Sequence, residues 1–547
     1  MNRCIAPFFL CFVLALSLAA CSNPVIEQPV AQKHAMPDQY SRFAVETMAE
    51  VAAYFPSATS LVAFTSYGTV VETVQAVEQW DMVNRSDLNQ AVSDLGTHYL
   101  LDPSKLKSFY DAGFHTGKGW GIGLLGRHVV VVLQTLDAKK VTAWLDNLVT
   151  EEFGRPVAED SKFDGWQFHT IHAMNKDVVT LMHKDGIAIM VWKGETLKAA
   201  KELIRVVGEG QTLAATTNMD EIKRNFRNAS ILALIPGKSA LPGTLIPENV
   251  RHWVEDLTKS LTVGVTLDPQ NANVRLATGL NPENAMVSEL QKLEGGVLGP
   301  WANPIIHTDP AVCGRVKLDP KQLIALLLKN APSKIQNQWK DISSKLNNRL
   351  LGINFEQQVV NNLGGSVWVS LNAVRSEALT VGTPLLPMIL DQDVSLYLTM
   401  ADAGLAAKFF GKMSFLQKFI PPDMAHIDTD QGVLHAIIKL EGKNVHVSYA
   451  DGLLAATTDS GWERMKKLYM NPDQKELSAS VLTDKANDLA ISGRSTPMMA
   501  LIRSICGVRC ADVTAIGRKA EHFDFRVMLD GNTLVSEIHL DRTQKNP

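Results

Sequence analysis

The sequence predicts an α+β protein built of two related repeats, each an antiparallel sheet covered by helices. Two pairs, Asp185-Gly186 and Asp451-Gly452, each separate two apolar segments rich in β-branched residues, as tight antiparallel turns do. An amphipathic segment follows each of these hairpins, which indicates a helix that packs on the sheet. A third pair, Asp530-Gly531, lies between two alternating segments near the C-terminus and predicts one further hairpin.

Residues 39–302 are predicted to form the first α+β unit, and hydrophobic periodicity assigns its elements. The expected elements are a helix at 39–54, a strand at 61–66, a hairpin at 120–133, a helix at 137–150, strands at 166–171, 178–183 and 187–192, and a helix carrying Ala199, Ala200 and Leu203.

Residues 303–547 are predicted to form the second unit, because several of its segments have the same sequence pattern as segments of the first unit. Trp368 is expected in the place of Trp120, and both side chains are expected to fill cores rather than line grooves. The alternative is that similar hairpins arose at unrelated positions. The expected elements are strands at 394–398, 444–450, 453–457, 525–529 and 533–538, a helix through Phe409 and Phe410, and a helix carrying Met465 and Leu468.

The N-terminus has the pattern of an export signal. Arg3 precedes an apolar run at 5–20, and the run ends in Leu18-Ala19-Ala20-Cys21. This ending resembles the lipobox of bacterial lipoproteins. The resemblance implies that residues 1–20 are a signal peptide and that the new N-terminal residue, Cys21, carries lipid. Because Ser22 rather than an aspartate follows, it also implies an outer-membrane location facing the periplasm. The alternatives are an ordinary secretory signal or an uncleaved anchor, for which the run is short.

Residues 21–38 are predicted to form a flexible, extended tether. Pro24, Pro29 and Pro37 lie there among polar residues, and a segment of this composition favours extended backbone. The folded body is therefore expected to stand away from the membrane that Cys21 enters.

Length and charge limit the classes of protein that fit. A chain of 547 residues suggests about two to four domains. Its formal net charge of −4, without a long basic run, argues against nucleic acid as a partner. The partners that remain are the membrane, through the lipid anchor, and a protein, glycan or lipid of the envelope.

The cysteines predict one disulfide and one buried thiol. Cys506 and Cys510 are natural partners in an oxidising compartment, and Gly507 between them lets the chain turn. The alternative, a metal pair, lacks nearby ligands to complete a tetrahedral set. Cys313 lies in an apolar stretch and is expected to be buried and free.

No motif assigns catalysis, a cofactor or a metal. Glycines 121, 123 and 126 match a dinucleotide-binding spacing, but a β-branched segment follows them where that site requires a helix, so we expect hairpin glycines. His169 and His172 are three residues apart, so on a strand their side chains would face opposite sides of the sheet. His183 lies on a nearby predicted strand. Histidines at a sheet surface are therefore favoured over a zinc site.

The segments Leu101-Asp102-Pro103 and Asp137-Ala138-Lys139-Lys140 resemble a pattern in uncharacterised bacterial envelope proteins of unknown function. The resemblance implies tandem α+β units behind an anchor and supplies no active site. The predicted function is a non-catalytic envelope lipoprotein that binds or scaffolds an envelope partner. The alternative is a hydrolase-like envelope enzyme whose catalytic residues are distant in sequence.

Overall fold

The computed structural model describes most residues from 43 to 542. The described residues are 43–80, 100–154, 156–173, 176–236, 256–268, 270–293, 310–317, 320–330, 362–373, 392–400, 425–430, 433–440, 442–450, 452–470, 486–499 and 520–542, with isolated positions between 305 and 344 and at 404, 482 and 484. Among these residues, no helix is long and apolar enough to cross a membrane.

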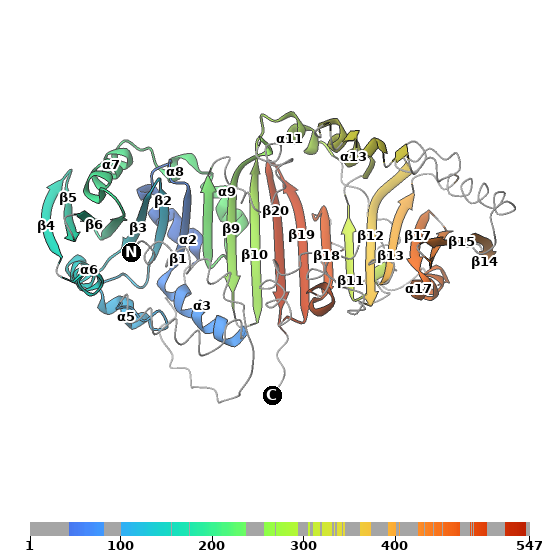
Figure 1. The fold of residues 1–547 in the computed structure, drawn as a ribbon, viewed down its shortest axis with the longest axis horizontal. Coiled ribbons are helices and arrows are strands. Elements are labelled where there is room, and N and C mark those ends of the chain that lie inside the picture. Colours follow the sequence, from blue (N-terminus) through green and yellow to red (C-terminus); the bar gives the residue numbers. More distant parts are fainter. Residues whose placement is uncertain are drawn as a thin grey trace. The chain divides into compact units, whose positions relative to one another are not determined.

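The chain is a mixed α+β protein with antiparallel sheet, and its contacts divide it into two compact units (Figure 1). Unit 1 comprises the described residues up to 236 together with Thr258–Thr278, and unit 2 comprises those of Gly279–Thr543 together with 256–257. The predicted boundary between residues 302 and 303 stays a prediction.

Unit 1 contains ten strands in the order β10-β9-β8-β1-β2-β3-β7-β6-β5-β4. Their bounds are β1 Leu61–Ser66, β2 Gly119–Leu125, β3 His128–Gln134, β4 Val157–Phe163, β5 Trp166–Ala173, β6 Lys176–Lys184, β7 Ile187–Trp192, β8 Ile231–Pro236, β9 Thr258–Leu267 and β10 Asn271–Leu280, whose last two residues belong to unit 2.

Helices lie on both faces of this sheet, whereas the sequence predicted cover on one side. The helices are α2 Ala44–Val51, η1 Ala52–Tyr54, α3 Tyr67–Trp80, α5 Leu106–Asp111, α6 Ala138–Phe153, α7 Thr196–Gly208, α8 Leu213–Thr216 and α9 Met219–Phe226. Helix α6 packs Leu145 in one core cluster with Val131. On the opposite face, Thr196 of α7 bonds Thr180. Because both faces are covered, β3 is buried along Val129–Leu133, and its apolar residues do not alternate with polar ones.

The strands of unit 2 have the same spatial order as those of unit 1, position by position. Its order is β20-β19-β18-β11-β12-β13-β17-β16-β15-β14. The bounds are β11 Val312–Val316, β12 Leu363–Ala373, β13 Asp393–Met400, β14 Ala425–Asp430, β15 Val433–Leu440, β16 Lys443–Ala450, β17 Leu453–Thr458, β18 Leu489–Arg494, β19 His522–Asp530 and β20 Thr533–Asp541, and its helices include α11 Ala285–Leu290, α13 Pro320–Asn330 and α17 Asp459–Met470.

Most predicted elements are confirmed near their expected bounds. The strands at 61–66 and 187–192 match β1 and β7, and all three Asp-Gly pairs join neighbouring antiparallel strands. Helix α6 begins at Ala138 because Asp137 accepts hydrogen bonds from the amides of Lys139 and Lys140. The helix predicted through Phe409 and Phe410 lies outside the described residues. No strand was predicted at the positions of β4, β8, β9 and β10 in unit 1 or of β11, β14, β15 and β18 in unit 2.

The predicted equivalence of Trp120 and Trp368 is wrong by one residue. The strand register aligns Trp120 of β2, across β3, with Ala188 of β7, which is the second residue after Asp185-Gly186. In unit 2 the second residue after Asp451-Gly452 is Leu454, and the register aligns it with Val367 instead of Trp368. A shift of one residue along a strand reverses the side-chain direction, so Trp368 faces the opposite side of its sheet from Trp120. Both tryptophans are buried, as predicted for core residues.

The glycines of β2 are required by packing, which confirms their assignment to a hairpin. A Cβ atom on Gly121 would lie 2.9 Å from the ring of Phe55, and one on Gly123 would lie 2.8 Å from the side chain of Thr59. Gly126, with φ of +58°, makes the turn into β3. A strand, not a helix, follows these glycines, so the geometry of a dinucleotide site is not formed.

Candidate functional site

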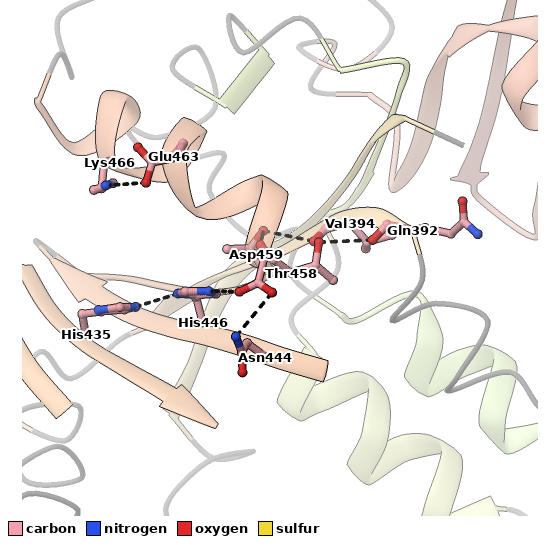
Figure 2. Close-up of polar contacts among 10 residues, drawn as sticks. Gln392, Val394, His435, Asn444, His446, Thr458, Asp459, Glu463 and Lys466 are labelled. Atoms are coloured by element: carbon pink, nitrogen blue, oxygen red, sulfur yellow. Dashed lines mark hydrogen bonds and ion pairs between the residues drawn. The ribbon is translucent and has the colours of Figure 1, made fainter. Parts of the chain in front are cut away.

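One cluster of titratable side chains in unit 2 joins two histidines and an aspartate. Nε2 of His435 lies 2.9 Å from Nδ1 of His446, and Nε2 of His446 lies 2.7 Å from Oδ1 of Asp459 (Figure 2). These three residues form what we call the histidine–aspartate chain. His435 is 4% exposed, whereas the Asp459 side chain is 65% exposed, so the chain runs from the surface into the interior.

Strand register and helix position bring the three residues together. His435 on β15 pairs with Ser448 in the ladder, and His446 on β16 pairs with Ile437, so the histidines are diagonal neighbours on one face. Asp459 is the first residue of α17, where a carboxylate is stabilised by the helix dipole. The chain therefore links two strands to the beginning of the helix that covers them.

Trp462 of α17 covers both imidazole rings. Its ring centroid lies 3.8 Å from that of His435 and 5.5 Å from that of His446, with interplanar angles of 6° and 12°. Lys466, one turn further on, lies 5.9 Å from the Trp462 ring centroid and 2.5 Å from Glu463 (Figure 2). An indole face attracts a cation, and Lys466 is the cation recorded over the Trp462 ring.

Other polar groups surround the chain. Nδ2 of Asn444 lies 3.4 Å from Oδ2 of Asp459, so that carboxylate has a second, longer contact. Asp428 of β14 stands opposite His435 in the strand register. At the other end of α17, the Tyr469 hydroxyl lies 3.1 Å from that of Ser448, and burial raises the pKa of Tyr469. Both ends of α17 are thus bonded to β16.

The chain can hold a proton and move it between two rings. The Asp459 carboxylate accepts a hydrogen from Nε2 of His446, and one hydrogen lies between the facing nitrogens of His446 and His435. Either ring can carry that hydrogen.

Unit 1 links the corresponding three elements with hydroxyl groups. Oγ1 of Thr180 on β6 lies 3.3 Å from that of Thr170 on β5 and 2.8 Å from that of Thr196 on α7. All three threonines are at most 1% exposed. The link between α7 and β6 in unit 1 therefore consists of hydroxyls together with the Asp177 carboxylate, which accepts from the amide of Leu197, whereas the link in unit 2 contains two imidazoles.

A second histidine cluster lies on the other face of unit 1. Nδ1 of His169 lies 2.7 Å from Asp160 of β4, and its Nε2 lies 2.8 Å from Asp146 of α6. Burial by itself lowers the pKa of His169, but the two carboxylates outweigh it, and the pKa is raised. Both ring nitrogens donate only in the protonated form of His169, so its two carboxylate contacts favour that form.

The other two histidines singled out in the sequence behave differently from His169. His172 points to the opposite face and lies 2.9 Å from Asp177 and 3.7 Å from Glu159, as the strand spacing predicted. His183 lies beside His169, and burial lowers its pKa. Among the described residues, no group of His, Cys, Asp or Glu could hold a metal ion, and no metal site was predicted.

Of the predicted cysteine sites, the structure describes only Cys313. It is 2% exposed and free, which confirms the prediction, and burial raises its pKa to about 12. Cys21, the predicted site of lipidation, and the predicted disulfide partners Cys506 and Cys510 lie outside the described residues.

Sequence reasoning missed the histidine–aspartate chain. Its members come from β15, β16 and α17, and 11 and 13 residues separate successive members along the chain. No local motif has this spacing. The one available signal was the prediction that segments 444–450 and 453–457 form a hairpin followed by a helix, which brings His446 and Asp459 near each other.

The comparisons with known proteins leave the chain without a family. No family model matches it, and no curated protein matches it. The chain is similar to solved structures of TP0453: crystal form III with a TM-score of 0.24 and 7% identity, over 45% of this chain and 89% of that chain; crystal form IV with 0.25 and 9%, over 45% and 87%; and crystal form I with 0.26 and 8%, over 45% and 88%. The function is therefore argued from the residues of this chain.

Proposed function

We propose that the protein is a lipid-anchored protein of the bacterial cell envelope that binds or scaffolds an envelope partner and catalyses no reaction. In this proposal residues 1–20 are removed, Cys21 carries the lipid, and residues 21–38 tether the body to the outer membrane on its periplasmic side. The partner is a protein, glycan or lipid of the envelope.

One observation carries the non-catalytic part of the proposal: the histidine clusters are occupied by the protein's own groups. Both ring nitrogens of His169 meet carboxylates, and both ring nitrogens of His446 meet other side chains. His435 and His446 are at most 6% exposed under Trp462. A general base must reach the proton that it abstracts, and these rings are covered.

We also propose that the two units arose by duplication. Ten strands recur in the same spatial order, and Asp-Gly turns join the corresponding strands β6–β7 and β16–β17. Two related units on one tether offer two related surfaces, which suits a binding or scaffolding protein.

The lipid anchor is tested by mass and by fractionation. The mature protein should begin at residue 21 and carry acyl mass there, and Cys21→Ser should release it from membranes. The matched control is Ser22→Ala, which leaves the lipidated thiol in place and should stay membrane-bound. Membrane retention of the Cys21→Ser form, with no acyl mass on the wild type, would refute the anchor.

The binding function is tested by photo-crosslinking in cells. Crosslinking residues introduced at exposed Val157 of unit 1 and Val369 of unit 2 should trap a defined envelope partner, and the Cys21→Ser form should lose it. The contrary outcome is turnover of an envelope substrate by the purified protein, abolished by His446→Gln, with no partner trapped. That result would favour the hydrolase alternative.

A further inference from the structure

We propose that His435 and His446 form a proton-binding site that takes up one proton and no more, and that Trp462 senses it. The proton-binding site lies within unit 2, and it is a property beyond the proposed binding of an envelope partner.

The two units join this helix to the sheet with different groups. In unit 1, hydroxyls link Thr180 of β6 to Thr196 of α7, and the Asp177 carboxylate of β6 accepts from the amide of Leu197. In unit 2, His435, His446 and Asp459 link β15, β16 and α17. The two imidazoles can carry a charge that depends on pH, which the hydroxyls of unit 1 cannot.

Hydrogen-bond geometry limits the site to one added proton. The 2.9 Å contact between Nε2 of His435 and Nδ1 of His446 accommodates a single hydrogen. With one positive charge on the pair, one facing nitrogen still donates and the other still accepts. With two charges both facing nitrogens carry hydrogens, so the contact would become repulsive.

Two side chains of α17 contact the pair. Asp459 accepts from His446, and the flat face of Trp462 lies over both rings, where an indole attracts a cation. Among the described side chains, the charged groups near the site are Asp459, Glu463 and Lys466 on α17, and the strand register places Asp428 of β14 opposite His435. Lys466 pairs with Glu463, and Asp459 contacts His446 directly.

Proton counting tests the proposal directly. Potentiometric titration of the mature protein between about pH 8 and about pH 5, where histidine ordinarily titrates, measures the protons taken up. Glutamine keeps hydrogen-bonding groups and does not titrate. We expect His435→Gln and His446→Gln each to leave the count unchanged, because the remaining histidine binds the one proton. The double variant should bind one proton fewer than the wild type.

Two outcomes would contradict the proposal. A loss of one proton in each single variant and of two in the double variant would show two independent histidines and overturn the proposal. No loss in the double variant would show that the pair stays neutral, which would overturn it as well.

A second measurement needs no variant of the histidines. In spectra of ring nitrogens labelled with nitrogen-15, His435 and His446 should shift together through one common midpoint. The pH-dependent fluorescence of the wild type, minus that of Trp462→Phe, should change through the same midpoint. Separate midpoints for the two rings would contradict the shared site.

Discussion

The imidazole rings of His435 and His446 lie parallel to within 6°, and 2.9 Å separates Nε2 of the first from Nδ1 of the second. Neighbouring strands hold this pair, and Trp462 of α17 covers it. The contact joins the sheet of unit 2 to the helix above it, so a change at either end of the chain should alter how firmly the helix is held.

Asp459→Ala should destabilise unit 2 by about 1 to 2 kcal/mol, because the nearly buried Nε2 of His446 loses its acceptor. Urea unfolding at neutral pH measures the change. The matched control is Asn444→Ala, which removes only the 3.4 Å contact to the same carboxylate and should cost less than about 0.5 kcal/mol. Equal losses in the two variants would contradict the importance of the contact between His446 and Asp459.

The His169 cluster should make stability depend on pH. Since the pKa of His169 is raised in the folded state, its contribution is fully present below the ordinary histidine pKa and is lost as the pH rises through the raised value. The loss should stay below about 1 kcal/mol, because Asp160 is exposed and solvent screens the pair. Urea unfolding of the wild type and of His169→Gln should give a stability difference that favours the wild type at about pH 6 and is smaller at about pH 9.

His183 serves as the control, because it should change stability with pH in the direction opposite to His169. Burial lowers its pKa, so its protonation opposes folding, and this penalty disappears as the pH rises. The His183→Gln variant should therefore gain stability at acidic pH relative to the wild type, where His169→Gln should lose it. The same direction of change in both variants would argue against these assignments.

Gly121→Ala should destabilise unit 1 by about 1 to 3 kcal/mol, because the added methyl group would overlap the ring of Phe55. Thermal and urea unfolding measure the effect. Gly208→Ala at the end of α7 is the matched control, since its Cβ would meet no atom within 4 Å, and there we expect a small gain in stability. A neutral Gly121→Ala would show that β2 and Phe55 are not closely packed.

Cys313 should be inert to alkylating reagents in the folded protein and reactive after unfolding. It is 2% exposed, and its pKa is raised to about 12, so little thiolate forms at neutral pH. Peptide mass mapping after brief iodoacetamide treatment, with and without urea, measures the difference. Rapid labelling of the native protein at Cys313 would contradict its burial.

The predicted elements that proved correct are those with a local signal. The Asp-Gly turns between β6 and β7 and between β16 and β17 could be recognised because residue type alone favours a tight turn there. Strand β4 was missed because six of its seven residues are exposed, and an edge strand without a buried face shows no alternation. Its polar residues resemble those of a loop.

Local residue patterns were enough to predict the α+β class and the Asp-Gly hairpins, because each follows from neighbouring residues. The export signal at residues 1–20 stays a prediction. Which side chains meet depends on contacts between segments that are distant along the chain. Strand register sets the direction of Trp368, since a shift of one residue reverses the face. Register and helix position together bring His435, His446 and Asp459 within hydrogen-bonding distance, and long-range pairing of this kind leaves no mark in the spacing of residues along the chain.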